Sequence, residues 1–245
     1  RKHTRIILHP PLTFSTAINN NITFEEIPYY RKGEWWVQDY SSMLPLSITD
    51  ISKFNNIADV GSAPGGKLFQ ITNKTNNVTP YEKNKIRSKI LKINLKRLKI
   101  KVDVKIEDFL NIKLDKKFDL IVLDAPCSSV GTIRRNPEIF FKNESPNFNY
   151  LIKQQYDLLK KSSKHLNKNG VIIYMVCSFL EEETTNQINK FLLHNSDFAI
   201  EKFEKDKKKL SDKFINEDGN ILITPNTILN DIKIDGYFAS KLIKK

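Results

Sequence analysis

The first residues that could do chemistry form the loop DVGSAPGGKL at residues 59–68, where Gly61 to Lys67 fit the phosphate-loop pattern G-x-x-x-x-G-K. That pattern ordinarily continues with Ser or Thr, whose hydroxyl binds magnesium, but Leu68 follows here. Pro64 also removes one backbone N–H from a loop that would need to direct N–H groups at phosphates. The loop therefore favours a ligand other than a nucleoside triphosphate.

Two acidic residues further along the chain favour a nucleoside ligand. Glu82 lies about twenty residues after Gly61, a spacing at which an acid can accept hydrogen bonds from a ribose diol. Asp108 follows the next expected strand and could meet an adenine amino group. Because the magnesium-binding hydroxyl is missing, S-adenosylmethionine fits better than ATP or NAD. We predict S-adenosylmethionine as the cofactor, against the alternative that both acids are ordinary surface residues.

The chain has two cysteines, Cys127 and Cys177, and each follows an apolar run. Two are too few for a disulfide scaffold or a Cys-built zinc site, so we expect no metal. Asp124 ends the first of these runs. A free cysteine is often only a small buried apolar residue. In open α/β sheets, however, ligands bind at the carboxyl ends of the strands, so the two positions together favour a reactive pair.

The pattern of strands and helices that would position these residues predicts an α/β fold. From Asn56 onward short apolar runs alternate with stretches of helical period, which is typical of a mostly parallel sheet with helices on both faces. The expected strands are 56–60, 77–81, 102–106, 118–124 and 171–176, with late strands near 198–203 and 236–243. The expected helices are 67–72, 84–99, 150–166 and 181–194.

Three segments carry more specific expectations. In helix 84–99 the spacing of Ile86, Ile90 and Ile93, with leucines beside them, predicts an amphipathic helix with a Lys/Arg-rich outer face. Residues 1–54 lack the strand–helix rhythm, so we predict an N-terminal extension that packs on a catalytic domain at 55–245. The polar segment 205–235 reads as a long loop or a short hairpin.

The charge balance indicates a polyanionic partner. The chain has 40 Lys and Arg against 28 Asp and Glu, a net charge of +12, and nucleic acid is the usual partner of such a protein. Codon bias is the alternative, because Lys, Asn and Ile are all enriched. No apolar run approaches the length of a membrane span, and no signal peptide is visible. We expect a soluble, cytoplasmic monomer without a membrane partner; the initial Arg1 suggests a fragment or a trimmed chain.

Several motifs occur together and in order: GEWWVQDYSS, ADVGSAPGGK, DLIVLDAPCSSVGTIRRNPE, YMVCSFLEEE and DGYFASKL. Over about Gly33 to Leu242 they resemble the RsmB/Sun/Nop family of RNA (cytosine-5)-methyltransferases. The resemblance implies a Rossmann-like S-adenosylmethionine-dependent methyltransferase fold. It also implies methyl transfer to carbon 5 of a cytosine in RNA, with ribosomal RNA as the first expectation and tRNA as the second.

The resemblance also implies roles for particular residues. Cys177 would be the nucleophile, Cys127 would assist proton removal and product release, Asp124 would hydrogen-bond the cytosine, and Lys67 would lie near them. Arg134 and Arg135 would hold RNA phosphates. The cofactor would contact Gly61, Ser62, Ala63, Pro64, Gly65, Gly66, Lys67, Glu82, Asp108 and Asp124.

Two other functions stay open at this point. DNA cytosine-5 methyltransferases use the cysteine of a Pro-Cys pair, which Pro126 and Cys127 supply, but they have no need of Cys177. A non-catalytic RNA-binding assembly factor could use the same scaffold, although the presence of both cysteines argues against lost catalysis. The departures Gly61 and Ser62, in place of the family's usual Cys and Ala, fall in the cofactor loop.

Overall fold

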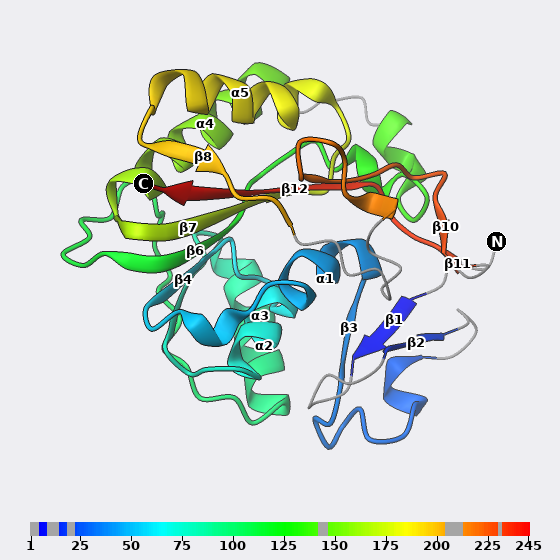
Figure 1. The fold of residues 1–245 in the computed structure, drawn as a ribbon. Helices are drawn as coiled ribbons and strands as arrows, with labels where there is room; N and C mark the ends of the chain where they lie inside the picture. The colour runs from blue at the N-terminus through cyan, green and yellow to red at the C-terminus, as the bar shows by residue number, and fades with distance from the viewer. Residues whose placement is uncertain (1–4, 9–14, 19–22, 142–146, 204–212, 230–231) are drawn as a thin grey trace.

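The computed structural model describes residues 5–8, 15–18, 23–141, 147–203, 213–229 and 232–245. Its centre is a seven-stranded sheet in the order β5-β4-β6-β7-β12-β8, with β9 paired to β12 (Figure 1). The strands are β4 (Ile57–Val60), β5 (Val78–Tyr81), β6 (Phe118–Asp124), β7 (Leu166–Val176), β8 (Phe198–Ile200), β9 (Ile221–Ile223) and β12 (Tyr237–Lys244). β5, β4, β6 and β7 are parallel, whereas β12 is antiparallel to its neighbours. The predicted mostly parallel, Rossmann-like α/β fold is confirmed.

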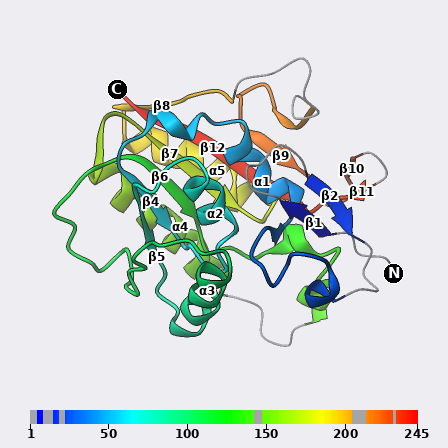
Figure 2. The same cartoon turned by 90° about the horizontal axis from the view of Figure 1, so that it is seen from below.

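Helices cover both faces of this sheet. α1 (Tyr40–Ser47), α2 (Gly66–Thr72) and α3 (Lys85–Arg97) lie on one side, and α4 (Phe148–Lys164) and α5 (Thr185–His194) lie on the other (Figures 1 and 2). Two small sheets lie outside this layer arrangement. One has the order β2-β1-β3, from β1 (Arg5–Leu8), β2 (Ser15–Ile18) and β3 (Trp36–Gln38), and the other pairs β10 (Ile228–Leu229) with β11 (Ile232–Lys233).

Short 3-10 turns connect several of these elements. They are η1 (Phe24–Glu26), η2 (Ile51–Lys53), η3 (Val130–Thr132), η4 (Pro137–Phe141) and η5 (Glu181–Glu183). The segment expected as a loop or hairpin at 205–235 contains β9 and the β10–β11 hairpin, and its residues 205–212 and 230–231 lie outside the described ranges. Within those ranges, no helix is both long and apolar enough to cross a membrane.

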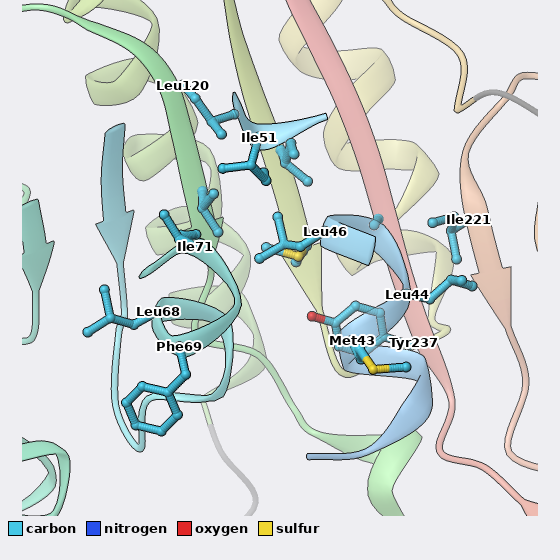
Figure 3. Packing of buried hydrophobic residues seen from close by; sticks show 14 of the residues in the cluster. Met43, Leu44, Leu46, Ile51, Leu68, Phe69, Ile71, Leu120, Ile221 and Tyr237 are labelled. Atoms are coloured by element: carbon cyan, nitrogen blue, oxygen red, sulfur yellow. The ribbon is translucent and has the colours of Figure 1, made fainter. Parts of the chain in front are cut away.

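The core on the α1–α2 side of the sheet draws on residues before position 54. Met43, Leu44 and Leu46 of α1 are buried with Phe69 of α2 and Tyr237 of β12 (Figure 3). Burying large apolar side chains stabilises a fold by roughly 1.5–3 kcal/mol each. α1 is therefore part of the same core as the sheet, while the proposed division between residues 54 and 55 stays a prediction.

The expectation of a regular strand at 102–106 is wrong. The chain there forms an isolated parallel bridge between Lys105 and Tyr81. Lys105 donates to the Pro80 carbonyl and accepts from the Glu82 N–H, at 2.9 and 3.0 Å. Pro80 has no N–H of its own to offer to this edge, so the pairing stops at one residue.

Helix α3 forms as predicted, but the expected apolar face is the wrong one. Ile86, Ile90 and Ile93 are 72%, 47% and 67% exposed, whereas Leu91 and Leu95 are buried. The isoleucines and the leucines both follow helical spacing, and the two stripes lie on different sides of the helix. Packing against the core selects the leucine stripe, which leaves the three isoleucines at the surface.

Candidate active site

The loop after β4 needs glycine at two positions. Gly61 has φ +81°, and an added Cβ would lie 2.5 Å from the Asp124 carbonyl oxygen. Gly65 has φ +123°, and its Cβ would lie 2.0 Å from the Phe69 ring. Any other residue would therefore meet both backbone strain and a clash. This brings the start of the loop against the end of β6, where Asp124 lies.

A cavity of about 70 Å³ lies over the carboxyl ends of β4, β5 and β6. Four residues predicted to bind the cofactor line it: Gly61, Glu82, Asp108 and Asp124. Asp108 accepts a hydrogen bond from the Leu110 N–H at 3.0 Å. The topology thus gathers acids from two loops and from the end of β6 around one small cavity, as the rule for parallel sheets requires.

The Glu82 carboxylate is also part of the loop's own support. It is buried, and it accepts hydrogen bonds from the Ala63 N–H at 3.2 Å and the Asn84 N–H at 2.8 Å. Arg87 lies 3.8 Å from the same carboxylate. Glu82 therefore ties the glycine loop to the start of α3 as well as lining the small cavity.

A larger cavity, of about 450 Å³, lies beside the first. The rest of the glycine loop lines it, through Ser62, Ala63, Pro64, Gly66 and Lys67. Asp124 and Cys177 line it too, so Asp124 faces both cavities. Of the loop residues predicted to contact the cofactor, the structure brings only Gly61 to the small cavity, and Gly65 packs against Phe69.

The two thiols lie side by side. The Sγ atoms of Cys127 and Cys177 are 3.3 Å apart, and the Cys177 sulfur is 3.4 Å from Ser129 Oγ. The hydrogen bond with Cys177, together with burial, raises the pKa of Cys127 well above its usual range. The hydrogen bond with Cys127 lowers the pKa of Cys177. The contact between the two sulfur atoms therefore favours the negative charge on Cys177 over Cys127.

An ion pair joins the loop to the end of β6. Lys67 Nζ lies 2.8 Å from Asp124 Oδ2 and 5.7 Å from the centre of the Tyr237 ring. Burial lowers the pKa of Lys67, but the charge of Asp124 and the hydrogen bond to it outweigh burial and raise that pKa. A lysine held as a cation here lowers the pKa of Cys177, while the Asp124 carboxylate beside it raises that pKa more strongly.

Arg134 and Arg135 lie in buried ion pairs within the protein. Asp235, which is 3% exposed at its side chain, lies 3.0 Å from Arg134 and 2.5 Å from Arg135, and Asp39 lies 3.5 Å from Arg134. Burial and the charge of Asp235 raise the pKa of Asp39. The Arg134 side chain is 10% exposed and pairs with two carboxylates inside the protein, whereas the Arg135 side chain is 33% exposed and lines the large cavity.

The sequence reasoning missed several residues of this cavity. Gln38, Asp39, Asp235 and Tyr237 line it, but none was among the expected site residues. All four lie in segments that carried the resemblance, GEWWVQDYSS and DGYFASKL. Their positions within these two motifs are the sequence signal that could have identified them as candidate site residues.

Asp59, at the end of β4, is a fully buried carboxyl group with no hydrogen-bond partner for either oxygen among the described residues. Burial raises its pKa from 3.8 to about 7. The unfolded chain therefore ionises this group near pH 4, while the folded protein keeps the proton until about pH 7. Its contribution to stability is fully present at low pH and is lost as the pH rises through that window.

We expect Asp59→Asn to remove this dependence, because an amide cannot ionise. At 1.36 kcal/mol per pKa unit, the variant should gain about 4 kcal/mol of stability relative to wild type between pH 4 and pH 8. Urea unfolding of both proteins at pH 4, 6 and 8 measures the difference. A difference that stays constant over this range would show that Asp59 ionises normally in the folded state.

Comparisons with known proteins add to this geometry. A model of the family described as 16S rRNA methyltransferase RsmB/F matches residues 48–243. Ribosomal RNA small subunit methyltransferase B of Cronobacter sakazakii is 30% identical over 243 residues, which cover 97% of this chain and 53% of that protein. The enzyme of the same name from Photorhabdus laumondii is 34% identical over 179 residues, 71% of this chain and 42% of that protein. The chain spans about half the length of these curated relatives.

Solved structures show the same fold. PH0851 superposes with a TM-score of 0.79 at 24% identity, covering 98% of this chain and 54% of that one. NSun6 from Pyrococcus horikoshii, solved with SFG, gives 0.75 at 22% identity, covering 95% and 60%. The fold is therefore shared over nearly the whole chain. Together with the family match over residues 48–243, it shows that this chain belongs to the RsmB/F family of 16S rRNA methyltransferases.

Proposed function

We propose that this chain transfers a methyl group from S-adenosylmethionine to carbon 5 of a cytosine in RNA, with small-subunit ribosomal RNA as the substrate class. The observation that carries the proposal is the Cys127–Cys177 pair, 3.3 Å apart, with the negative charge favoured on Cys177. Cys177 lines a cavity large enough for a base, next to a cavity with acids suited to a nucleoside. Family membership supports RNA as the substrate.

The residues around the small cavity fit S-adenosylmethionine. Gly61 keeps its space free of a side chain, Glu82 offers a carboxylate for a ribose diol, and Asp108 offers one for an adenine amino group. No phosphate needs to be accommodated, which agrees with Leu68 and Pro64 in the loop. When bound, this cofactor supplies an electrophilic methyl group on a positively charged sulfur.

Carbon 5 of cytosine is a poor nucleophile until a group adds to carbon 6. The Cys177 thiolate would form a bond to carbon 6, which makes carbon 5 enamine-like and able to accept the methyl group. Lys67 and Asp124, 2.8 Å apart, would hydrogen-bond the ring as its charge changes. The base must leave its stack to reach this cavity, which is easiest in unpaired RNA.

Release of the product needs the second thiol. In the adduct Cys177 is a neutral thioether, so it no longer favours a proton on Cys127, and that proton passes to solvent. The Cys127 thiolate then takes the proton from carbon 5 as the bond between carbon 6 and Cys177 breaks. The pair returns to one thiol and one thiolate, and each turnover releases one proton.

Binding of RNA would draw on the net charge of +12 and on Arg135 at the cavity. We retain Arg135 as a proposed phosphate contact, since a guanidinium group suits phosphate geometry. Arg134 contacts two carboxylates inside the protein, and for it we propose a supporting role through Asp235 and Asp39. Protein–RNA affinity that depends on released counterions falls log-linearly with salt concentration.

We expect saturable binding of S-adenosylmethionine and none of ATP with magnesium, because the small cavity offers acids rather than phosphate ligands. Asp108→Ala should weaken cofactor binding about tenfold, the effect of losing one hydrogen bond to a charged group. Isothermal titration calorimetry measures both. Asp103→Ala is the matched control, because Asp103 is an exposed acid nearby that pairs with Lys105. ATP binding that Lys67→Ala abolishes would instead support a phosphate loop.

A further inference from the structure

The reaction proposed above does not use Glu183, although this residue is fully buried next to the thiol pair. Glu183 lies on η5, after β7, and its carboxylate accepts three hydrogen bonds. The donors are the Ser128 N–H at 2.7 Å, Ser128 Oγ at 2.5 Å and Gln155 Nε2 at 3.0 Å. Its backbone carbonyl accepts a hydrogen bond from Tyr174 Oη at 2.7 Å.

A carboxylate in this position is costly. Burying a charge without an opposite charge is strongly unfavourable unless hydrogen bonds compensate for the lost water. No described lysine, arginine or histidine forms an ion pair with Glu183, and neutral donors provide all three hydrogen bonds. A glutamine side chain at this position could keep most of the same hydrogen bonds without a charge. Hydrogen bonding alone therefore does not explain why a charged residue is buried here.

The contacts of Glu183 fix the segment that carries Cys127. Ser128 follows Cys127 directly and gives two of the three hydrogen bonds. Gln155 of α4, also fully buried, donates both to Glu183 and to the carbonyl of Pro126, which precedes Cys127. The backbone is therefore held on both sides of Cys127, from α4 and from η5.

The charged groups around the two sulfur atoms are asymmetric. Cys127 faces the charge of Glu183 and the phenol of Tyr174, along with Cys177 itself. Cys177 faces the Lys67 cation, and further groups around it are Asp124, Ser129, Arg135 and Tyr237. The negative charge of Glu183 on the Cys127 side favours the thiolate on Cys177, whereas on the Cys177 side the Lys67 cation favours the thiolate and the Asp124 carboxylate opposes it more strongly.

We propose that Glu183 is a positioning residue for this reaction: it holds Cys127 beside Cys177 and keeps the shared proton on Cys127. The catalytic consequence rests on the proposed function, because it concerns release of the methylated base. The preference of the shared proton for Cys127 is a property of the protein without RNA or cofactor. Once Cys177 has become a thioether and Cys127 has lost its proton to solvent, the charge of Glu183 makes the Cys127 thiolate a stronger base for the proton on carbon 5.

The substitution Glu183→Gln tests the charge of Glu183 separately from its hydrogen bonds. The glutamine oxygen can accept the hydrogen bonds from the Ser128 N–H and Gln155, and its amide N–H can donate to Ser128 Oγ, so only the charge is lost. Glu183→Asp does the reverse, because it keeps the charge and shortens the side chain. Glu182→Gln is the matched control, since Glu182 is exposed on the same turn.

The measurement is the rate of alkylation of each thiol by iodoacetamide from pH 5 to pH 11, followed by peptide mass spectrometry on the 245-residue protein. For Glu183→Gln we expect the midpoint of Cys127 to fall by about one pH unit and that of Cys177 to rise, as coupled groups do. Glu182→Gln and Glu183→Asp should keep the wild-type order of the midpoints. A folding control is the thermal unfolding midpoint of each variant.

Unchanged midpoints in a folded Glu183→Gln protein would overturn the inference. If that variant does not fold, Glu183→Asp decides: reversal of the two midpoints, with the charge retained, would equally overturn it. Alkylation needs neither RNA nor cofactor, so the result stands apart from the proposed methyl transfer. Should the wild-type protein fail to methylate cytosine while the midpoints shift as expected, only the proposed function would be rejected.

Discussion

Cys177→Ala is expected to abolish both methyl transfer and any covalent protein–RNA complex, whereas Cys127→Ala is expected to accumulate the complex. The two steps need different groups, because one sulfur must add to carbon 6 and another group must accept the proton from carbon 5. Of the two cysteines, Cys177 is the one that lines the large cavity, and the hydrogen bond with Cys127 lowers the pKa of Cys177. Loss of Cys177 should reduce turnover by at least about a thousandfold, the scale of removing a nucleophile.

Denaturing electrophoresis of labelled, in vitro transcribed 16S rRNA with protein and S-adenosylmethionine measures the complex. RNA with fluorine at carbon 5 of its cytosines gives a second test, since no proton can leave and wild type should be trapped. Ser129→Ala is the control, because it removes a hydroxyl beside Cys177 but no thiol. A complex that persists in Cys177→Ala and disappears in Cys127→Ala would reverse the roles and favour the mechanism of DNA cytosine-5 methyltransferases.

Asp235→Ala is expected to destabilise the protein by about 3–5 kcal/mol, the scale of breaking a buried ion pair from one side. Asp235 is nearly inaccessible and lies within 3.0 Å of both Arg134 and Arg135. Its removal leaves Arg134, which is 10% exposed, with only the more distant Asp39. A guanidinium group cannot lose its proton to avoid this cost, so the weakened pairing appears directly as lost stability.

Urea unfolding monitored by circular dichroism measures this loss. Asp50→Ala is the matched control, because Asp50 also pairs with a cation, Lys53, at 3.6 Å, but both side chains are more than half exposed. Exposed pairs contribute about 0–1 kcal/mol. Equal effects of the two substitutions would mean that Asp235 contributes no more than a surface charge.

The sequence predicts which residues lie together in space wherever a residue follows a strand. Gly61, Glu82 and Asp124 each come just after or at the end of a parallel strand, and parallel strands share one carboxyl edge. Their convergence therefore follows from the element order alone. The same rule brought Cys127 and Cys177 together, because β6 and β7 are neighbours in the sheet.

What the sequence does not predict depends on packing between distant segments. Arg134 and Asp235 are 101 positions apart, and no local pattern pairs them. Periodicity also does not choose between two stripes on α3, because the leucine and isoleucine stripes have comparable spacing. The division of the glycine loop between two cavities likewise depends on side-chain positions.

The placement of Asp124 between the two cavities has a consequence for how the two ligands influence each other. Its carboxylate holds Lys67 in the larger cavity while its residue also lines the smaller one. In the proposed reaction, a base that changes this hydrogen bond would alter the cavity wall that the cofactor contacts, and the cofactor would affect binding of the base in the same way. By thermodynamic linkage, each ligand then changes the other's equilibrium affinity by the same factor. Under the proposed function, one carboxylate would thus couple the binding of the cofactor to the binding of the base.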